Sequence, residues 1–229
     1  MSLSIYDHEQ GSDEWKQARA GILTASVVGK LLTPTLQLAK NQTSRGLIRE
    51  IVAERLTGIP TDTYTTRDME RGSLDEPYAR EVYSEHMGYP IDETGFMVRD
   101  IEGHKLGYSP DGLIADTGLL EIKSRKPRLQ LDFIIDGEIP HDHMAQMQAG
   151  MLVADRDWCA YVSYSGGLRM PIQFVNADER WHDAIKQALA AFEKEAEVIT
   201  SAYKAATVTF PETEYIDHFG DELEFTFGK

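Results

Sequence analysis

Three charged residues near the centre of the chain have the types and spacing of a hydrolytic site. Asp111 lies in the turn sequence Ser-Pro-Asp-Gly, and Glu121 and Lys123 follow in the apolar run Leu-Leu-Glu-Ile-Lys. Side chains alternate between the two faces of a β-strand, so Glu121 and Lys123 project from one face while Ile122 points into the core. Antiparallel pairing would bring Asp111 back beside Glu121. We therefore expect two carboxylates and one ammonium to converge.

This trio suits the hydrolysis of a phosphodiester. Carboxylates bind Mg²⁺ through a few direct ligands, and water and substrate phosphate complete the shell. Mg²⁺ stabilises charge on the phosphate and lowers the pKa of a bound water. The backbone carbonyl of Ile122 is a further candidate ligand beside Asp111 and Glu121. Burial and nearby positive charge would lower the pKa of Lys123, which could then hold or deprotonate the water. We expect two Mg²⁺ ions, with Mn²⁺ able to substitute.

Each half of this pattern also has an ordinary explanation. Pro-Asp-Gly is a common turn, and a Glu-x-Lys pair on a strand usually belongs to a solvated face. The two together are more specific, because an apolar strand then carries its charges ten residues after the Asp turn. From the spacing alone, a nuclease site and a plain hairpin both stay open.

The other reactive side chains indicate less. Cys159 lies in the apolar run 158–164, which is typical of a buried strand, so we interpret it as a core thiol. A single cysteine fits a reducing cytoplasm. His141 and His143 lack the spacing of a helical zinc pair and have no third ligand nearby, so the start of a helix is the better interpretation.

The elements around these residues predict an α/β fold, with a mixed central sheet flanked by helices. Residues 1–229 are expected to form one nuclease domain, and the acidic tail 204–229 has no clear assignment. The expected helices are 12–19 (capped by Ser12), 24–32, 43–56 (closed by Gly58), 73–87 (with Pro77 in its first turn), 141–153 and 178–203. The expected strands are 96–98, 106–108, 113–115, 119–123, 158–165 and 170–175.

Composition limits the kind of partner. The chain has 229 residues, 41% of them hydrophobic, and a net charge of −15. It shows no membrane-length apolar run and no signal-peptide core. The acidic balance argues against broad coating of DNA. Lys123, Arg125, Lys126 and Arg128 would supply a local basic patch on an acidic exterior.

At this point the chain resembles a known family. Ser109-Pro-Asp111-Gly with Leu120-Glu121-Ile-Lys123 looks like the signature of PD-(D/E)xK nucleases. The wider pattern is similar to the bacteriophage lambda exonuclease and YqaJ-type viral recombinase family. The matching blocks, besides the Asp/Glu/Lys block, are Gly11-Ser-Asp-Glu-Trp15-Lys-Gln-Ala-Arg19-Ala-Gly21-Ile-Leu-Thr-Ala-Ser26, Arg71-Gly-Ser-Leu-Asp-Glu76 and Met144-Ala-Gln146-Met-Gln148.

The resemblance implies roles for five residues of the catalytic site. Asp111 and Glu121 match metal-binding carboxylates, and Lys123 matches the lysine that activates water. Glu76 matches an additional acidic residue, and Gln146 matches a glutamine that supports the site. Near a helix start, Glu76 could instead be a surface acid that favours the helix dipole.

The resemblance also implies a pocket for a terminal 5′-phosphate. Arg19 and Ser26 match residues that hold the phosphate, and Trp15 matches an aromatic residue near the opening of the pocket. Arg19 could instead pair with Asp13 or Glu14, Ser26 could be only a helix cap, and Trp15 could belong to the core. A helix N-terminus with a free hydroxyl is itself an anion site, so capping and phosphate binding can coexist.

The implied function is 5′-to-3′ digestion of one strand of double-stranded DNA from its end. It leaves a 3′ single-stranded overhang and mononucleotides. The resemblance further implies a homotrimer, a single-strand annealing partner and a role in phage-type recombination in the bacterial cytoplasm. Two alternatives stay open: a repair or restriction endonuclease of the same fold, and a DNA-end-binding protein without catalysis. In the family, an arginine in the loop after the second helix engages the downstream duplex. The corresponding residues here, 33–43, contain no matching arginine, so Lys40 or the nearby Arg45 is the candidate for that role.

Overall fold

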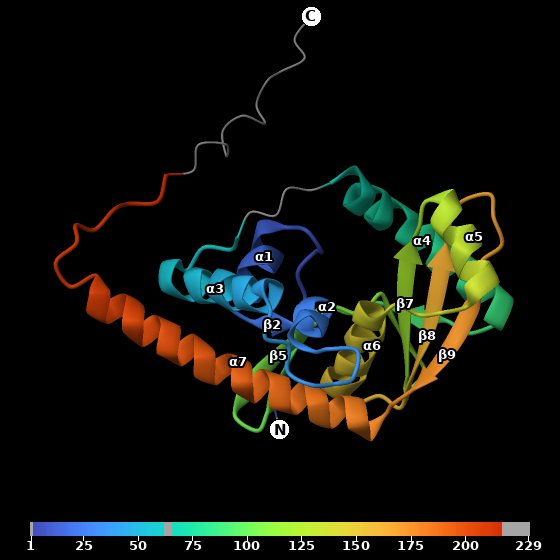
Figure 1. Ribbon diagram of the computed structural model, residues 1–229. Helices are drawn as coiled ribbons and strands as arrows, with labels where there is room; N and C mark the ends of the chain where they lie inside the picture. Colours follow the sequence, from blue (N-terminus) through green and yellow to red (C-terminus); the bar gives the residue numbers. More distant parts are fainter. Residues whose placement is uncertain (1, 62–65, 217–229) are drawn as a thin grey trace, which may run out of the picture.

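The computed structural model describes residues 2–61 and 66–216 (Figure 1). The strands are β1 (Leu3–Tyr6), β2 (Leu23–Thr24), β3 (Ile91–Asp92), β4 (Phe96–Ile101), β5 (His104–Tyr108), β6 (Gly112–Ile114), β7 (Gly118–Ser124), β8 (Trp158–Tyr164) and β9 (Ile172–Asn176). The helices are α1 (Asp13–Arg19), α2 (Ala25–Val28), the 3₁₀ turn Gly29–Leu31, α3 (Gln42–Thr57), α4 (Arg67–Met87), α5 (Pro127–Asp136), α6 (His141–Ala154) and α7 (Glu179–Ala206).

The strands form two mixed sheets, one of four strands in the order β1-β4-β5-β2 and one of five in the order β3-β6-β7-β8-β9. The predicted α/β class is confirmed, but the strands divide into two sheets where the sequence suggested one. In the larger sheet, β6 and β7 form an antiparallel hairpin that pairs Gly112 with Leu120. On its other side β7 runs parallel to β8, with Glu121 opposite Tyr161. β7 is therefore an interior strand, which fixes its register.

Helices cover both faces of the larger sheet (Figure 1). On one face, Leu120 and Ile122 of β7 pack with Ala79 and Tyr83 of α4. On the other face, Leu119 belongs to a core that includes residues of α6 and α7. α6 contacts strands of both sheets, and the long α7 lies along α6 and α3. The alternation along β7 therefore directs Glu121 and Lys123 away from α4, toward the α6 side.

Helix ends follow the sequence signals at most positions. Ser12 accepts a hydrogen bond from the Trp15 amide at the start of α1, and Gly58 ends α3 in the left-handed conformation. The prediction for α4 was wrong at its start, since the helix begins at Arg67 after a cap by Thr66. Pro77 consequently lies inside the helix, well beyond the first turn.

Helix α5 was not predicted, although Pro127 at its first turn and left-handed Gly137 after its end are ordinary helix signals. Cys159 is fully buried, as expected for a core thiol. α7 extends to Ala206, so it includes the first residues of the predicted tail; residues 217–229 of that tail lie outside the described part. Within the described residues, no helix is long and apolar enough to cross a membrane.

Candidate active site

The β6–β7 hairpin brings the three central charges together. The Ile122 amide donates a hydrogen bond to Asp111 Oδ2 at 2.6 Å, which joins the Asp turn to the strand. Lys123 Nζ lies 2.7 Å from Glu121 Oε1. On the α6 side, Lys123 Nζ donates to Gln146 Oε1 at 3.0 Å. Gln148, two residues later, points away and bonds the Asn176 carbonyl and the Asp178 amide.

Glu121 is fully buried, and its second oxygen has a partner that the sequence did not indicate. The Tyr108 hydroxyl donates to Glu121 Oε2 at 3.2 Å. Tyr108 packs against α6 where Gly150 has no side chain, since a Cβ there would lie 2.6 Å from the ring. The glycine in α6 therefore allows the tyrosine to reach the carboxylate.

Glu76 comes from α4 and faces the same carboxylates. Its Oε1 accepts from Arg80 Nη2 at 2.5 Å, and its side chain is only 18% exposed, which disfavours a simple surface acid. Arg80 also donates to the Asp111 carbonyl at 2.9 Å and pairs with Glu93 at 2.7 Å. Arg80 was missed in the sequence, although its i, i+4 spacing from Glu76 on a helix was a usable signal.

The crowding of carboxylates shifts their pKa values. Burial and the neighbouring charges of Glu121 and Glu76 raise the pKa of Asp111 well above its ordinary value. Burial is also the largest cause of the raised pKa of Glu76. Burial acts to lower the pKa of Lys123, but Glu121 and Asp111 outweigh it and the pKa is raised. The sequence led us to expect a lowered lysine pKa, so the protein's own groups act in the opposite direction.

The donor set fits a hard cation that supplements the protein ligands with water. Within 2–61 and 66–216, no three His, Cys, Asp or Glu side chains form a ready-made metal cluster. Glu121 Oε1 is buried and lacks a hydrogen bond of good geometry, despite the nearby ammonium. Asp111 and the buried Glu121 thus repel each other, and an added cation would relieve that repulsion.

Asp111, Glu121 and Glu76 form one wall of the site, the carboxylate wall. Arg19 carries the opposite charge and forms a second wall with Trp15 and Ser26, the arginine wall. Its Nη1 donates to Ser109 Oγ at 3.2 Å, and its guanidinium lies 4.1 Å from the ring centre of Trp15. Burial lowers the pKa of Arg19 to about 10, so it stays charged at neutral pH. Neither alternative pairing of Arg19, with Asp13 or with Glu14, is found among the described residues, and Asp13 pairs with Lys16.

Ser26 lines the same cleft as this arginine and is exposed. It does not cap a helix, because Thr24 occupies the cap position of the four-residue α2. The Ser26 hydroxyl is instead 3.1 Å from the hydroxyl of Thr24. Trp15 is partly buried and lines the cleft, so it is not confined to the core.

One cleft of about 460 Å³ joins the two walls. A neighbouring cleft of about 620 Å³ shares Trp15, Glu76 and Asp111 with it. Every residue that the sequence singled out for the site lines the first cleft: Trp15, Arg19, Ser26, Glu76, Asp111, Glu121, Ile122, Lys123 and Gln146.

The prediction of a basic patch at Lys123, Arg125, Lys126 and Arg128 was wrong. Arg125 turns inward, donates to the Tyr161 hydroxyl at 2.7 Å and lies over the Phe133 ring. The following basic residues are paired with acids, Lys126 with Asp68 at 2.8 Å and Arg128 with Asp132 at 3.2 Å. The four basic residues therefore do not form an unpaired cationic surface. Lys123 pairs with Glu121, Lys126 and Arg128 pair with acids of α4 and α5, and Arg125 bonds a buried tyrosine.

Comparison with known proteins identifies relatives over most of the chain. The structure is similar to that of an alkaline exonuclease from Laribacter hongkongensis, at 31% sequence identity and a TM-score of 0.75, covering 86% of this chain and 98% of that one. The same values hold for the complex of the Laribacter protein with dAMP. A phage related exonuclease from Haemophilus somnus 129PT shares the fold, with 15% identity and a TM-score of 0.57 over 80% of this chain and 96% of that one.

No curated protein sequence matches the chain. Residues 14–157, well over half of the chain, match the YqaJ-like viral recombinase domain. This range contains every candidate site residue, from Trp15 to Gln146. The chain therefore belongs to the YqaJ-like viral recombinase family, as its motifs predicted.

Proposed function

We propose that the protein is a Mg²⁺-dependent exonuclease that digests one strand of duplex DNA from its 5′ end. The products would be a 3′ single-stranded overhang and mononucleotides. Family membership indicates a nuclease that acts on DNA. The observation that carries the finer proposal is the single cleft in which a buried carboxylate group faces Arg19 and Ser26. One wall suits a cation and the other suits a terminal phosphate.

Asp111, Glu121 and the Ile122 carbonyl would be the protein ligands of the metal. We propose that two Mg²⁺ ions bind and that Mn²⁺ can replace them. When bound, the metal supplies charge stabilisation at the phosphate and a more acidic water. Glu76 adds negative charge to the same wall, held by Arg80. These groups all lie within the cleft, so they need no rearrangement of the fold to act together.

Lys123 is the group that handles the proton of the attacking water. In the free protein it is charged, and Gln146 fixes its Nζ beside Glu121. It can then donate a hydrogen bond to the water and keep it oriented. A cation bound by Asp111 and Glu121 would offset the negative charges that raise the pKa of Lys123. The lysine could then more readily accept a proton from the water.

Arg19 and Ser26 would bind the 5′-phosphate. The guanidinium can bind a phosphate with two parallel hydrogen bonds, and Trp15 holds its plane by stacking. Phosphate held at this wall places the next phosphodiester near the carboxylate wall of the same cleft. The Laribacter exonuclease forms a complex with dAMP, a mononucleotide. That complex supports a cleft that accepts a single terminal nucleotide.

The assembly and setting are also proposals. The chain is acidic and its basic side chains near the site are paired, so one copy offers little surface for holding a duplex. A homotrimer would surround the DNA with several copies of the cleft wall. We further propose a single-strand annealing protein as partner, and phage-type recombination in the bacterial cytoplasm as the setting. A mass in solution of three times 25.8 kDa would support the trimer.

The test is a timed digestion of matched linear duplexes in Mg²⁺, labelled at either end and carrying either a 5′-phosphate or a 5′-hydroxyl. We expect loss of the 5′ label first, release of mononucleotides, and a roughly tenfold to hundredfold preference for the phosphorylated end. Covalently closed circular DNA should stay intact. Cleavage of the circle would favour a repair or restriction endonuclease, and binding without cleavage would favour a DNA-end-binding protein.

A further inference from the structure

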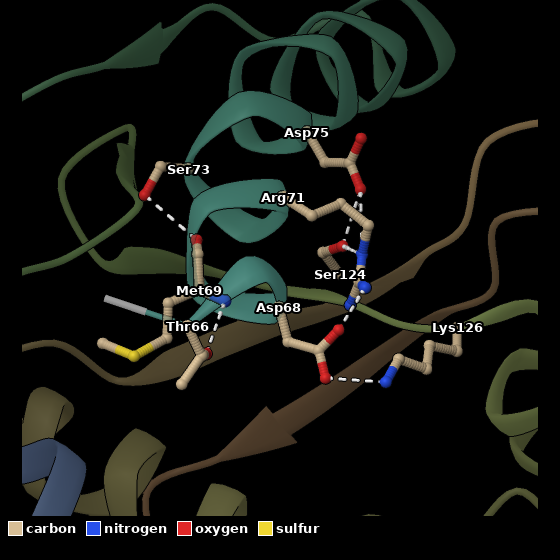
Figure 2. A network of polar contacts seen from close by, with 8 residues as sticks. All are labelled: Thr66, Asp68, Met69, Arg71, Ser73, Asp75, Ser124 and Lys126. Carbon is tan, nitrogen blue, oxygen red and sulfur yellow. Dashed lines mark hydrogen bonds and ion pairs between the residues drawn. The ribbon is translucent and has the colours of Figure 1, made fainter. Parts of the chain in front are cut away.

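A polar cluster of Arg71, Asp75 and Ser124 joins α4, which carries Glu76, to β7, which carries Glu121 and Lys123 (Figure 2). Lys123 and Ser124 are consecutive in β7 and therefore point to opposite faces. On the face toward α4, the Ser124 hydroxyl donates to Asp75 Oδ2 at 2.6 Å. Arg71 Nε donates to the same hydroxyl at 3.1 Å and lies 3.9 Å from Asp75 Oδ2.

The positions of these residues in the chain give the cluster its significance. Asp75 directly precedes Glu76, and Ser124 directly follows Lys123. The bond from Ser124 to Asp75 thus joins the neighbours of two candidate catalytic residues that lie far apart in sequence. Because the bond is short and has a charged acceptor, it is stronger than a neutral hydrogen bond.

The first turns of α4 have little apolar attachment to the sheet. The buried residues of α4, Ala79 and Tyr83, come after Glu76, whereas Met69 and Leu74 before it are 50% and 65% exposed. Glu76 therefore lies where the packed part of the helix gives way to its exposed start. The polar cluster is what attaches that start to the end of β7 (Figure 2).

We propose that Arg71, Asp75 and Ser124 are positioning residues that set the place of Glu76 relative to Lys123. The inference rests on the proposed nuclease function of the same site. Arg71 and Asp75 are 34% and 24% exposed, so their ion pair adds little to folding stability. Their effect is on geometry, because a small displacement of a catalytic group lowers the rate far more than it lowers stability.

An outer arm extends the cluster to the surface. Asp68 accepts from Arg71 Nη1 at 2.7 Å and pairs with Lys126 Nζ at 2.8 Å. Figure 2 shows these contacts in a row from Asp75 through Arg71 to Lys126. Asp68 and Lys126 are 53% and 60% exposed, so they steady Arg71 from the solvent side and contribute less than Ser124 does.

The experiment compares Ser124→Thr with Ser124→Val in the full-length protein. Threonine and valine have the same shape, and only threonine keeps the hydroxyl that links Arg71 to Asp75. We expect Ser124→Thr to keep near wild-type turnover, and Ser124→Val to lower kcat about tenfold and raise the Mg²⁺ concentration needed for half-maximal rate. KM for DNA should stay within about twofold of the wild-type value, because the cluster is proposed to act on Glu76 and Lys123 and not on the arginine wall.

The control is the matched pair Ser84→Thr and Ser84→Val on the same helix. The Ser84 hydroxyl donates to the Tyr89 carbonyl at 2.6 Å, at the far end of α4. Its loss should affect thermal stability and leave kcat unchanged. Equal kcat for the two Ser124 variants, or an equal fall in the Ser84→Val variant, would overturn the positioning role. Absence of Mg²⁺-dependent cleavage by the wild type would instead overturn the proposed function and, with it, this inference.

Discussion

The two walls of the cleft are dominated by charge of opposite sign. The carboxylate wall places Asp111, Glu121 and Glu76 close enough that burial and mutual repulsion raise the pKa of Asp111. The arginine wall buries the Arg19 guanidinium against an aromatic ring and a neutral hydroxyl, and burial lowers its pKa. Each wall is therefore suited to a ligand that balances its charge. Under the proposed function, their adjacency would set a direction, with a phosphate at one side and a cation at the other.

The walls also differ in how the chain builds them. In the carboxylate wall, Glu76 comes from α4, but Asp111, Glu121 and Lys123 come from one hairpin, so local turn geometry and strand alternation nearly determine the arrangement of those three. The arginine wall needs α1 to lie against the segment that carries Ser109, which is 90 residues away in sequence. A local arrangement tolerates change elsewhere in the fold. An arrangement of remote elements depends on packing between them.

The largest expected effect comes from breaking the carboxylate wall. Asp111→Ala, Glu121→Gln and Lys123→Ala should each lower turnover by at least about a thousandfold, because several kcal/mol of charge stabilisation depend on this set. Single-turnover digestion measures the loss, and circular dichroism checks the fold. Near wild-type turnover in any of these variants would remove that residue from the site.

The second test separates metal binding from catalysis at the same wall. Ca²⁺ also takes oxygen ligands but has longer bonds, looser geometry and a weaker effect on the pKa of bound water. We expect Ca²⁺ to support DNA binding in a gel-shift assay and to give at most about one hundredth of the Mg²⁺ rate. Mn²⁺ should restore cleavage. Robust digestion in Ca²⁺ alone would contradict a Mg²⁺-type site.

The third test breaks the arginine wall alone. Arg19→Ala should slow digestion of 5′-phosphorylated ends by roughly tenfold to hundredfold and leave 5′-hydroxyl ends nearly unchanged. Arg19→Lys should recover only part of the preference, since lysine keeps the charge and loses the planar fork and the stacking on Trp15. Arg49→Ala, an exposed arginine on α3, is the matched control. A wild-type protein that digests both kinds of end at one rate would have no phosphate pocket at this wall.

The difference between the walls explains what the sequence could predict. Alternation along 119–123 and the Asp turn were enough to place Asp111, Glu121 and Lys123 together, because the physics is local. Tyr108 escaped notice because an alternating strand gives no sign of which carboxylate a buried hydroxyl will reach. The contacts of Arg80 with the Asp111 carbonyl and Glu93 escaped for a similar reason, since they depend on where α4 lies on the sheet.

Two errors came from interpreting charge without its surroundings. The basic residues from Lys123 to Arg128 were interpreted as a local basic patch, and α5, which begins at Pro127, was overlooked in the same stretch. Lys126 pairs with Asp68 of α4, and Arg128 pairs with Asp132 of α5. The division into two sheets was equally hidden, because it depends on long-range pairings such as β1 with β4.

The smallest expected effect concerns His143 of α6, which packs against Tyr161. Its Nδ1 is 2.7 Å from the Tyr161 hydroxyl, and burial, followed by the charges of Lys123 and Arg125, lowers its pKa to about 3. It therefore adds no positive charge to the carboxylate wall at neutral pH. Above the unfolded pKa of about 6.5, the ring is neutral in both states.

As the pH falls below that value, the unfolded chain takes up a proton that the folded protein refuses, so stability is lost progressively down to about pH 3. His143→Gln removes this titration and can keep a hydrogen bond to Tyr161. Between pH 7 and pH 4.5, the wild type should lose about 1–2 kcal/mol more unfolding free energy than the variant, after allowance for partial exposure of the ring. Urea unfolding at the two pH values measures the difference, and the carboxylates shared by both proteins cancel. Equal losses would mean that His143 becomes charged within the fold on mild acidification, which would add a further positive charge near Lys123 and Arg125.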